Sequence, residues 1–338
     1  MVDSAERSTR ILAIETSCDE TAAAVVEDGR TILGDVVASQ TDFHAKFGGV
    51  FPEVASRIHV EVVHQTVSQA LKESYLGVDD LDCIAVTVGP GLVGSLLVGV
   101  NVAKGIAVGR NIPLLGINHI EGHVYSLWLT EAADEIEFPL VVLVVSGGHT
   151  EMLLMTDHLN YEHLGRTLDD AAGEAFDKVG RLLGLPYPGG PAIDSSSGKG
   201  DPNSFRFPRA VLRDGYNFSF SGLKTAVMRE TKRYESDRIP IYDIAASFQA
   251  AVVDVLVAKT IIAAGEFDAA AVHIVGGVSA NQALRREMKA QLSIPVRFPP
   301  KELCTDNAAM IGAAAHQRFL AGFRDSLDLD VVPNLRLT

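Results

Sequence analysis

A pattern of two apolar segments around a polar turn occurs twice in this chain and constrains its fold more than any other feature. Residues 11–26 read ILAI, ETSCDET and AAAVV, and residues 140–155 read LVVLVV, SGGHTE and MLLM. Short apolar runs around such turns are typical of β-hairpins. Each copy is followed by another apolar run and a helical pattern, in 83–108 and in 270–292. The repeat predicts a duplicated α/β domain with partly parallel sheets that helices cover on both faces.

Apolar spacing and capping residues predict the helices and one long loop region. Thr305 and Asp306 are suitable capping residues for the last helix. The segment 185–220 is rich in Pro, Gly and Ser, so we expect a long loop region there. Helices are expected at 53–76, 94–109, 119–130, 170–184, 241–264, 280–291 and 305–321.

Length, composition and charge narrow the class of protein. The 338 residues suggest about two domains, and 47% hydrophobic with 21% charged residues exclude a disordered chain, a collagen and a coiled coil. The net charge of −14 argues against a general attraction to nucleic acid or to an anionic membrane. A local basic segment remains open as a contact for nucleic acid, because residues 206–238 carry eight basic and four acidic residues.

The chain carries no clear targeting or membrane signal. Its N-terminus has acidic residues and no apolar run before Ile11, which excludes a secretory signal. The uncharged stretch 83–103 approaches the length of a membrane span, but Gly89, Pro90 and Gly91 interrupt it, so a strand, a turn and a helix explain it better. Three cysteines cannot form a disulfide framework. We therefore expect a cytoplasmic protein with no membrane partner.

The sequence HIEGH at 119–123 is the strongest candidate for a metal site. On a helix, His119 and His123 share one face, close enough to bind one ion, although two histidines at a helix start are also common without a metal. Glu121 would point away from them, so the pattern does not match a zinc protease. A third ligand could come from anywhere in the chain, and Asp306 is one candidate.

Glycine-rich turns occur three times and favour a nucleotide ligand. They are SGGHT at 146–150, PYPGGP at 186–191 and VGGVSAN at 275–281. Glycine allows backbone amides to approach a phosphate, and the last turn ends at a helix N-terminus, although tight turns need glycine in any case. The chain contains neither a P-loop nor a GxGxxG motif after the first strand. Asp177 could reach a ribose hydroxyl from a helix, or be a solvated surface acid.

Taken together and in order, the motifs resemble those of the TsaD family of tRNA N6-adenosine threonylcarbamoyltransferases. The similarity runs from about Ile11 to Ala315. The motifs are ETSCDET, HAKFGGVFPEVASRIH, GPGLVGSLLVG, NHIEGH, SGGHT, DDAAGEAFDK, YPGGPAID, FSFSGLKTA, GGVSAN and CTDNAAMIG. The resemblance implies the duplicated actin-like (ribonuclease H-like) fold of sugar kinases and Hsp70-type ATPases, with a central cleft.

We accordingly expect an N-terminal actin-like domain at 9–118 and a C-terminal actin-like domain at 119–321. The second domain would contain the loop-rich insertion 185–220, and the tail 322–338 could pack on the first domain.

The resemblance also implies roles for individual residues. It implies one divalent metal ion per subunit, iron or zinc, held by His119, His123 and Asp306. Asp19 and Glu20 would lie in the turn that faces the reacting end of the ligand, where they could accept the proton that N6 loses. Contacts to the adenylate (an ATP-like nucleotide ligand) are implied for Val144, Val145, Ser146, Gly147, Gly148, Asp177, Gly190, Asp194 and Asn281.

The implied reaction is transfer of threonylcarbamoyl from threonylcarbamoyl-AMP to N6 of the adenine next to the anticodon, position 37, in tRNAs that read ANN codons. The implied partners are tRNA, a TsaB-type paralogue as heterodimer mate, a TsaE-type ATPase and a TsaC-type adenylate synthase upstream. We expect the paralogue to dock on residues 44–59. Two alternatives remain at this point: a small-molecule kinase or ATPase of the same fold, and a non-catalytic partner scaffold.

Overall fold

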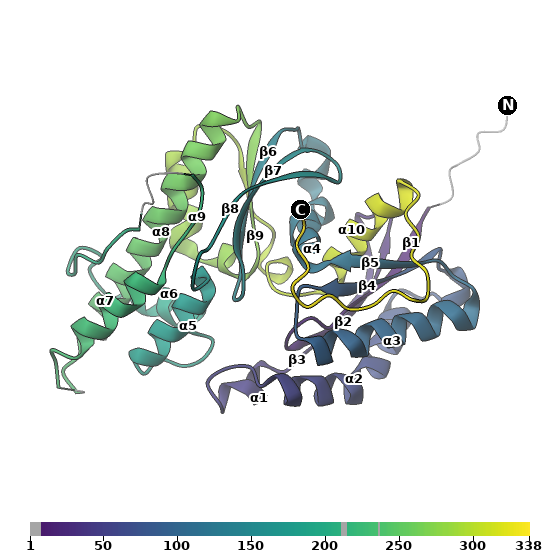
Figure 1. The fold of residues 1–338 in the computed structure, drawn as a ribbon, viewed down its shortest axis with the longest axis horizontal. Coiled ribbons are helices and arrows are strands. Elements are labelled where there is room, and N and C mark those ends of the chain that lie inside the picture. The colour runs from purple at the N-terminus through teal and green to yellow at the C-terminus, as the bar shows by residue number, and fades with distance from the viewer. Residues whose placement is uncertain (1–7, 211–214, 236) are drawn as a thin grey trace. The chain divides into compact units, whose positions relative to one another are not determined.

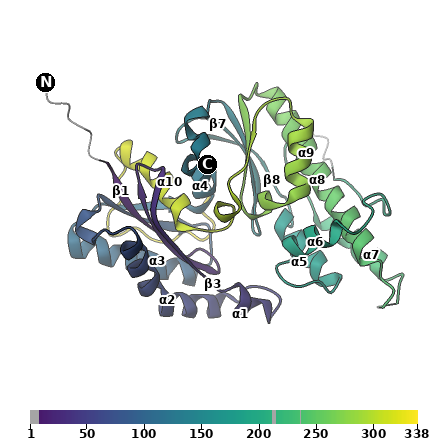
Figure 2. The same ribbon diagram turned by 180° about the vertical axis from the view of Figure 1, so that it is seen from behind.

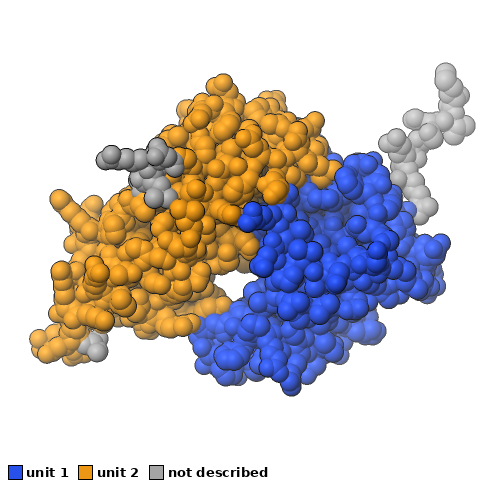
Figure 3. Space-filling model, in the orientation of Figure 1, with its two compact units in different colours: residues 1–135, 306–337 blue, residues 136–305, 338 orange. Residues whose placement is uncertain are grey.

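A computed structural model describes residues 8–210, 215–235 and 237–338 of the chain. The chain divides into two compact units (Figure 3): unit 1 comprises Met1–Glu135 and Asp306–Leu337, and unit 2 comprises Ile136–Thr305. This division differs from the expected domain boundaries, because residues 119–135 and 306–321 belong to unit 1. The helices in these two segments pack against each other and on the sheet of unit 1.

Unit 1 contains a five-stranded mixed sheet in the order β3-β2-β1-β4-β5 (Figure 1). Strands β1, β2 and β3 are antiparallel neighbours, whereas β4 and β5 run parallel to β1. Residues 16–19, within the polar segment ETSCDET, connect β1 to β2, so the predicted hairpin is present. The strands are β1 (Arg10–Glu15), β2 (Glu20–Glu27), β3 (Thr31–Ser39), β4 (Cys83–Gly89) and β5 (Leu114–Asn118).

Helices cover both faces of the unit 1 sheet. Helices α2 and α3 pack on one face through buried residues such as Val63, Val67, Val100 and Ala103. On the other face, α10 lies on β1 and β2, and α4 packs against α10 (Figure 2). The helices are α1 (Thr41–Ala45), α2 (Pro52–Glu73), α3 (Val93–Arg110), α4 (His119–Tyr125) and α10 (Ala308–Leu320).

The C-terminal tail after α10 also belongs to unit 1. The Asp325 carboxylate accepts a hydrogen bond from the Gly116 backbone N–H at 2.8 Å, next to the edge strand β5. Further along, the Val332 N–H donates to the Val88 carbonyl at 2.8 Å, and the Gly91 N–H donates to the Pro333 carbonyl at 3.0 Å. The tail therefore runs from the edge of the sheet to the glycine turn after β4.

Unit 2 contains a second five-stranded sheet in the order β10-β9-β6-β7-β8. Strands β6, β7 and β8 are antiparallel neighbours, and β9 and β10 are added in parallel. Counted along the chain within each unit, both sheets have the order 3-2-1-4-5 and the same strand directions, which confirms the predicted duplication. The strands are β6 (Leu140–Val145), β7 (Thr150–Asp157), β8 (Asn160–Arg166), β9 (Ala271–Val275) and β10 (Val296–Arg297).

The core of unit 2 forms between this sheet and its helices. Phe176 on α5 and Phe248 on α8 meet at right angles with ring centroids 5.3 Å apart, among buried residues such as Leu143 and Ile274 of the sheet. The helices are α5 (Ala172–Leu182), α6 (Gly189–Ser197), α7 (Ser221–Thr231), α8 (Ile241–Glu266) and α9 (Gln282–Gln291).

The predicted loop region 185–220 is partly wrong. Helix α6 lies inside it, and α7 follows directly in a segment where no helix is expected. Glycine and serine have low helix propensity, so the sequence GGPAIDSSS does not predict a helix on its own. Packing of α6 against α5 and α8, with Ile193 fully buried, stabilises the helix despite this composition.

Two helices, α3 and α8, are long and apolar enough to cross a membrane by length and composition. In this structure α8 is largely buried in the core of unit 2, and α3 packs one face on the sheet of unit 1. The uncharged stretch 83–103 thus forms β4, the glycine turn and the first part of α3.

Candidate functional site

Helix α4 places two histidines side by side. Asn118, at the end of β5, caps the helix by accepting a hydrogen bond from the Ile120 N–H at 2.8 Å, so α4 begins directly at His119. One turn later His123 lies on the same face, and the two ring centroids are 4.7 Å apart. Both imidazoles are buried. The predicted spacing is therefore realised on a helix.

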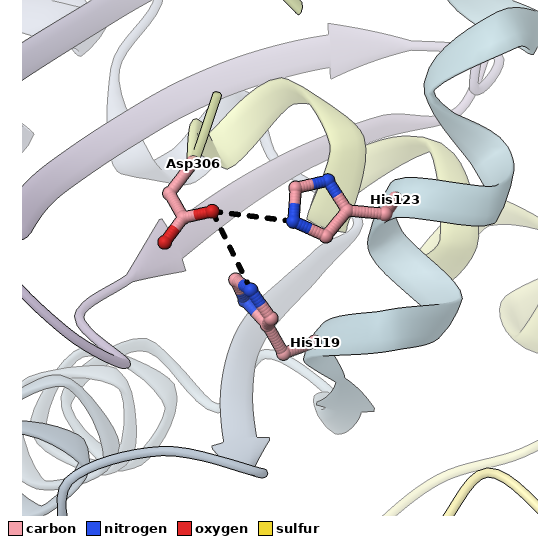
Figure 4. A group of neighbouring side chains, drawn as sticks. All are labelled: His119, His123 and Asp306. Carbon is pink, nitrogen blue, oxygen red and sulfur yellow. Dashed lines mark ion pairs between the residues drawn. The ribbon is translucent and has the colours of Figure 1, made fainter. Parts of the chain in front are cut away.

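Asp306, which lies just before α10, completes a cluster with these histidines (Figure 4). Its Oδ1 atom is 3.2 Å from His123 Nε2 and 3.5 Å from His119 Nε2. Asn307 caps α10 by accepting from the Met310 N–H at 2.9 Å, which fixes the start of the helix beside Asp306. One ligand atom from each of the three residues lies within 4.8 Å of the others.

The cluster fits a divalent transition metal ion. Two imidazole nitrogens and one carboxylate are donors that iron and zinc accept. The Nε2 atom of His123 is buried and has no hydrogen-bond partner among the residues that the structure describes, although it faces Asp306. A buried nitrogen in this position is available to an ion.

Glu15, which sequence reasoning missed, orients His119. Its fully buried carboxylate lies 3.0 Å from His119 Nδ1 and accepts a hydrogen bond from the Thr87 hydroxyl at 2.5 Å and another from the Ser17 backbone N–H. A carboxylate on Nδ1 leaves Nε2 free to face the ligand cluster. The available signal was an acidic residue at the carboxyl end of the buried strand β1.

Burial and nearby charges shift the pKa values of Asp306, His119 and His123. Burial opposes ionisation of Asp306, but the two imidazoles outweigh it and hold the pKa of Asp306 well below its usual range. Burial alone would lower the pKa of His119, yet Asp306 and Glu15 raise it well above its usual range. The pKa of His123 is lowered by burial. The pKa values of the two imidazoles are therefore shifted in opposite directions, and both rings face an Asp306 carboxyl group whose pKa is lowered.

Glu121 points away from the two histidines, as the sequence predicts. Its fully buried carboxylate pairs with Arg318 on α10, with 2.6 Å between Oε2 and Nε. The acid of HIEGH therefore connects α4 to α10 and is not part of the ligand cluster.

Asp19 lies in the turn between β1 and β2, and Glu20 is the first residue of β2, both in unit 1. Glu20 Oε1 accepts hydrogen bonds from the Ser39 hydroxyl at 3.0 Å and the Thr41 hydroxyl at 3.4 Å. Burial, followed by the negative charges of Asp19 and Asp306, raises the pKa of Glu20 to about 9. A carboxyl group that is protonated near neutral pH next to a second acid is suited to proton transfer.

The candidate nucleotide contacts all lie in unit 2. Val144 and Val145 end β6, and their side chains are fully buried, so only their backbone can face a ligand. The Ser146 N–H donates to the His149 carbonyl at 2.8 Å, which closes the turn. Added side chains at Gly147 and Gly148 would meet no atom within 4 Å, which leaves this turn open to a ligand.

The other candidate residues form two neighbouring pairs in unit 2. Asp177 on α5 accepts from the Gly189 N–H at 2.7 Å, beside Gly190 at the start of α6. Asp194 on α6 accepts from the Gln282 N–H at 3.3 Å, beside Asn281. Asn281 caps α9 through its Oδ1 and donates from Nδ2 to Gln249 at 2.7 Å. The side chains of Asp177, Asp194 and Asn281 thus each form at least one hydrogen bond within the protein.

Comparisons with known proteins agree on one family. Residues 31–313 match the model of the family described as "TsaD: tRNA N6-adenosine threonylcarbamoyltransferase". A tRNA N6-adenosine threonylcarbamoyltransferase of Thermomicrobium roseum is 52% identical over 97% of this chain and 96% of its own length. The Bacillus subtilis protein of the same name is 50% identical, with 99% and 98% covered.

The solved structure of T. kodakarensis HypF shares the fold of this chain. It matches with a TM-score of 0.65 and 14% sequence identity, and the match covers 94% of this chain and 49% of HypF. At this identity only the fold is comparable. The likeness, with the two repeated sheets, confirms the predicted actin-like fold class.

Proposed function

Because this chain belongs to the TsaD family of tRNA N6-adenosine threonylcarbamoyltransferases, we propose that His119, His123 and Asp306 form the metal centre of the transfer reaction. The protein transfers a threonylcarbamoyl group to N6 of adenine 37 of tRNA, which forms N6-threonylcarbamoyladenosine (t6A). Among the alternatives, a kinase of this fold would hold magnesium through oxygen ligands and would not need imidazoles. The histidine cluster therefore favours the transferase.

The three ligands would hold one divalent ion, iron or zinc. When bound, such an ion supplies a Lewis acid that polarises an oxygen of the donor. Both histidines offer Nε2 toward Asp306, and Glu15 keeps the His119 ring in this orientation. The residues of the chain thus provide a preorganised set of ligands.

The adenylate part of the donor is assigned to unit 2. We place it at the open turn of Ser146, Gly147 and Gly148 with the backbone of Val144 and Val145, and at the neighbouring residues Asp177, Gly190, Asp194 and Asn281. Backbone amides at glycine turns suit a phosphate, and carboxylates suit ribose hydroxyls. The donor is expected to be threonylcarbamoyl-AMP, a mixed anhydride whose AMP leaves readily.

Asp19 and Glu20 are assigned to the proton that N6 loses. Because the donor is already activated, the protein mainly has to position N6 and the carbonyl carbon and to stabilise charge. Glu20 accepts a hydrogen bond from the Ser39 hydroxyl at the end of β3, and burial together with the charge of Asp19 raises the pKa of Glu20 to about 9. Because Glu20 already holds a proton near neutral pH, the carboxylate of Asp19 is the group that would take up the N6 proton as the new bond forms.

The family and the charge of the chain support proposals for its substrate and partners. The proposed substrates are tRNAs that read ANN codons. The proposed partners are a TsaB-type paralogue that docks on residues 44–59, a TsaE-type ATPase and a TsaC-type adenylate synthase, all in the cytoplasm. Phosphate contacts are assigned to the basic segment 206–238, of which Arg213 lies outside the described residues. Anticodon-loop bases are unpaired, so adenine 37 can enter a pocket without opening a duplex.

The observation that carries this proposal is the convergence of His119, His123 and Asp306, and Asp306→Asn tests it. The substitution keeps the shape of the side chain but removes the negative charge that faces both imidazoles. We expect the purified variant to lose most of its bound metal in elemental analysis. Transfer to tRNA with supplied threonylcarbamoyl-AMP and the partner proteins should fall in parallel.

Asp79→Asn is the matched control, because Asp79 is an exposed aspartate of the same unit with a side chain 75% accessible. It should change neither metal content nor transfer. An Asp306→Asn protein with normal metal content and normal transfer would remove the proposed metal centre.

A further inference from the structure

We propose that His59 on α2 is a positioning residue that holds the turn between β1 and β2 for the reaction. This inference rests on the roles proposed for Asp19, which lies in that turn, and for Glu20, which follows it as the first residue of β2. The argument comes from the contacts around the turn, all of which lie within unit 1.

Three consecutive backbone carbonyls of the turn are each held from a different element. The Ser17 carbonyl accepts from the Leu92 N–H at 2.8 Å, at the start of α3. The Asp19 carbonyl accepts from the Gln40 N–H at 3.0 Å, at the end of β3. Between them, the Cys18 carbonyl lies 3.0 Å from His59 Nε2. The backbone of the turn is thus anchored at three successive points.

Of the three carbonyls, only that of Cys18 is held by a side chain of the described residues, the imidazole of His59. The hydrogen bonds of His59 define one neutral tautomer. A carbonyl oxygen can only accept, so Nε2 carries the proton and donates to Cys18. The other nitrogen, Nδ1, then accepts from the Thr21 hydroxyl at 2.7 Å. Burial lowers the pKa of His59, which maintains the neutral form near pH 7. The imidazole therefore binds the chain on both sides of Asp19 and Glu20.

The helix that carries His59 is a rigid support. His59 lies on the buried face of α2 with Ala55 and Val63, one turn before and one turn after it. Because this face packs on β2 and β3, the imidazole transmits the position of the helix to the turn. Side chains that must sit within fractions of an ångström of a reacting atom depend on such support.

A set of substitutions separates the two hydrogen bonds of His59. The Nε2 atom of glutamine is as many bonds from Cβ as histidine Nε2, so His59→Gln can still donate to the Cys18 carbonyl. The amide of asparagine instead matches Nδ1, so His59→Asn can contact only Thr21. His59→Leu removes both bonds. The matched control is His64→Gln, which changes an exposed histidine on the same helix.

Two measurements are made on the full chain with its metal and partners. The first is threonylcarbamoyl transfer to tRNA, with kcat and KM determined separately. The second is the rate at which a thiol reagent modifies Cys18, which is partly exposed, whereas Cys83 and Cys304 are buried. Cys18→Ser identifies the signal. The labelling rate reports on the turn without any turnover.

We expect His59→Leu and His59→Asn to lower kcat by about tenfold to a hundredfold with little change in the KM for tRNA. Both should label at Cys18 several-fold faster and keep their metal. His59→Gln should restore most of kcat and the slow labelling, and His64→Gln should match the unchanged protein.

Unchanged labelling in His59→Leu and His59→Asn overturns the anchoring of the turn. Equal behaviour of the glutamine and asparagine variants also overturns it, because a purely structural histidine would not distinguish them. Faster labelling with unchanged kcat overturns the importance of the turn for transfer, and with it the roles proposed for Asp19 and Glu20.

Discussion

Each nitrogen of His119 faces a different carboxylate, and this division determines what the residue can bind. Nδ1 lies 3.0 Å from Glu15 and Nε2 lies 3.5 Å from Asp306. Glu15 is itself held by Thr87 and by the backbone of Ser17. The orientation of one ligand ring is therefore set by residues from β1 and β4, strands that contribute no ligand themselves.

Asp35 on β3 gives a prediction about stability and pH. Its Oδ1 is buried without a hydrogen-bond partner among the described residues, and burial, followed by the charge of Glu73, raises the pKa of Asp35 to about 6. The unfolded chain has a pKa of about 3.9 at this residue. The folded state thus holds the proton more tightly, and the free energy of unfolding falls as pH rises from about 4 to about 6.

Asp35→Asn should therefore stabilise the protein above pH 6, by at most about 3 kcal/mol. The gain should disappear near pH 4, where Asp35 is neutral in both states. Thermal unfolding of the variant and the unchanged protein across this range checks it, with Asp79→Asn as the exposed control. A gain in Tm that is the same at every pH would contradict the prediction.

For individual residues, the sequence predicts only relations between positions that are close along the chain. The i, i+4 relation of His119 and His123 is visible in five residues. Before the resemblance was considered, Asp306 was only one candidate among many acidic residues. Its contact with the two histidines is a tertiary contact between distant parts of the chain, which local spacing does not predict. Glu15 and His59 were missed for the same reason: a buried acid and a buried histidine show their partners only once β1, α2 and α4 are folded.

At the scale of elements, α4 and α10 form the support of the proposed metal ligands. Gly122 allows close approach, because a Cβ there would lie 2.6 Å from Ile311 Cδ1 on α10. The second attachment is the ion pair of Glu121 and Arg318. Two attachments fix both the distance and the relative rotation of the helices, and hence the position of Asp306 next to the histidines.

Arg318→Met should loosen this support. It leaves the fully buried Glu121 carboxylate without its arginine, which costs about 3 kcal/mol for a buried pair. We expect a lower Tm and weaker metal retention against a chelator, although all three ligands remain. The double variant Glu121→Gln with Arg318→Met should recover much of the loss, because no buried charge is left.

Arg110→Met is the control for this experiment, since Arg110 pairs with the exposed Asp79. A surface pair contributes at most about 1 kcal/mol, so its loss should leave metal retention unchanged. If Arg318→Met retains metal as well as Arg110→Met does, the ion pair does not support the ligand cluster.

Among the elements, those with a strong periodic signal were predicted well. Both hairpins and the long helices α2, α3 and α8 follow from apolar runs and helical spacing. Helix α6 was missed because glycine, proline and serine indicate a turn, whereas burial of Ile193 against its neighbours decides the conformation. Local propensity fails where tertiary packing outweighs it.

At the scale of the whole molecule, charge is the main constraint on binding tRNA. The net charge of −14 opposes approach to a polyanion, so attraction has to be local. Within the basic segment, Arg229 and Lys232 are exposed at the end of α7 and form no ion pair with any residue that the structure describes. These two cations are therefore well placed to neutralise phosphates.

The double variant Arg229→Gln with Lys232→Gln should weaken binding of tRNA by the protein together with its proposed partners. Two lost phosphate contacts would reduce the slope of log K against log salt concentration by roughly 1.5. Binding titrations at several salt concentrations check this. Lys72→Gln with Arg110→Gln removes the same charge from exposed sites of unit 1 and should leave the slope unchanged. Equal effects of the two double variants would show that only net charge matters.

The separation of the metal ligands along the chain has a consequence for biosynthesis. His119 and His123 are synthesised early, but Asp306 lies 183 positions after His123 (306 − 123), and the residues between them include nearly all of unit 2. At about 5–20 residues per second, this delay lasts roughly 10–40 s. Nascent chains therefore carry the histidine pair without its carboxylate for that period, and the proposed metal centre can be completed only when translation is almost finished.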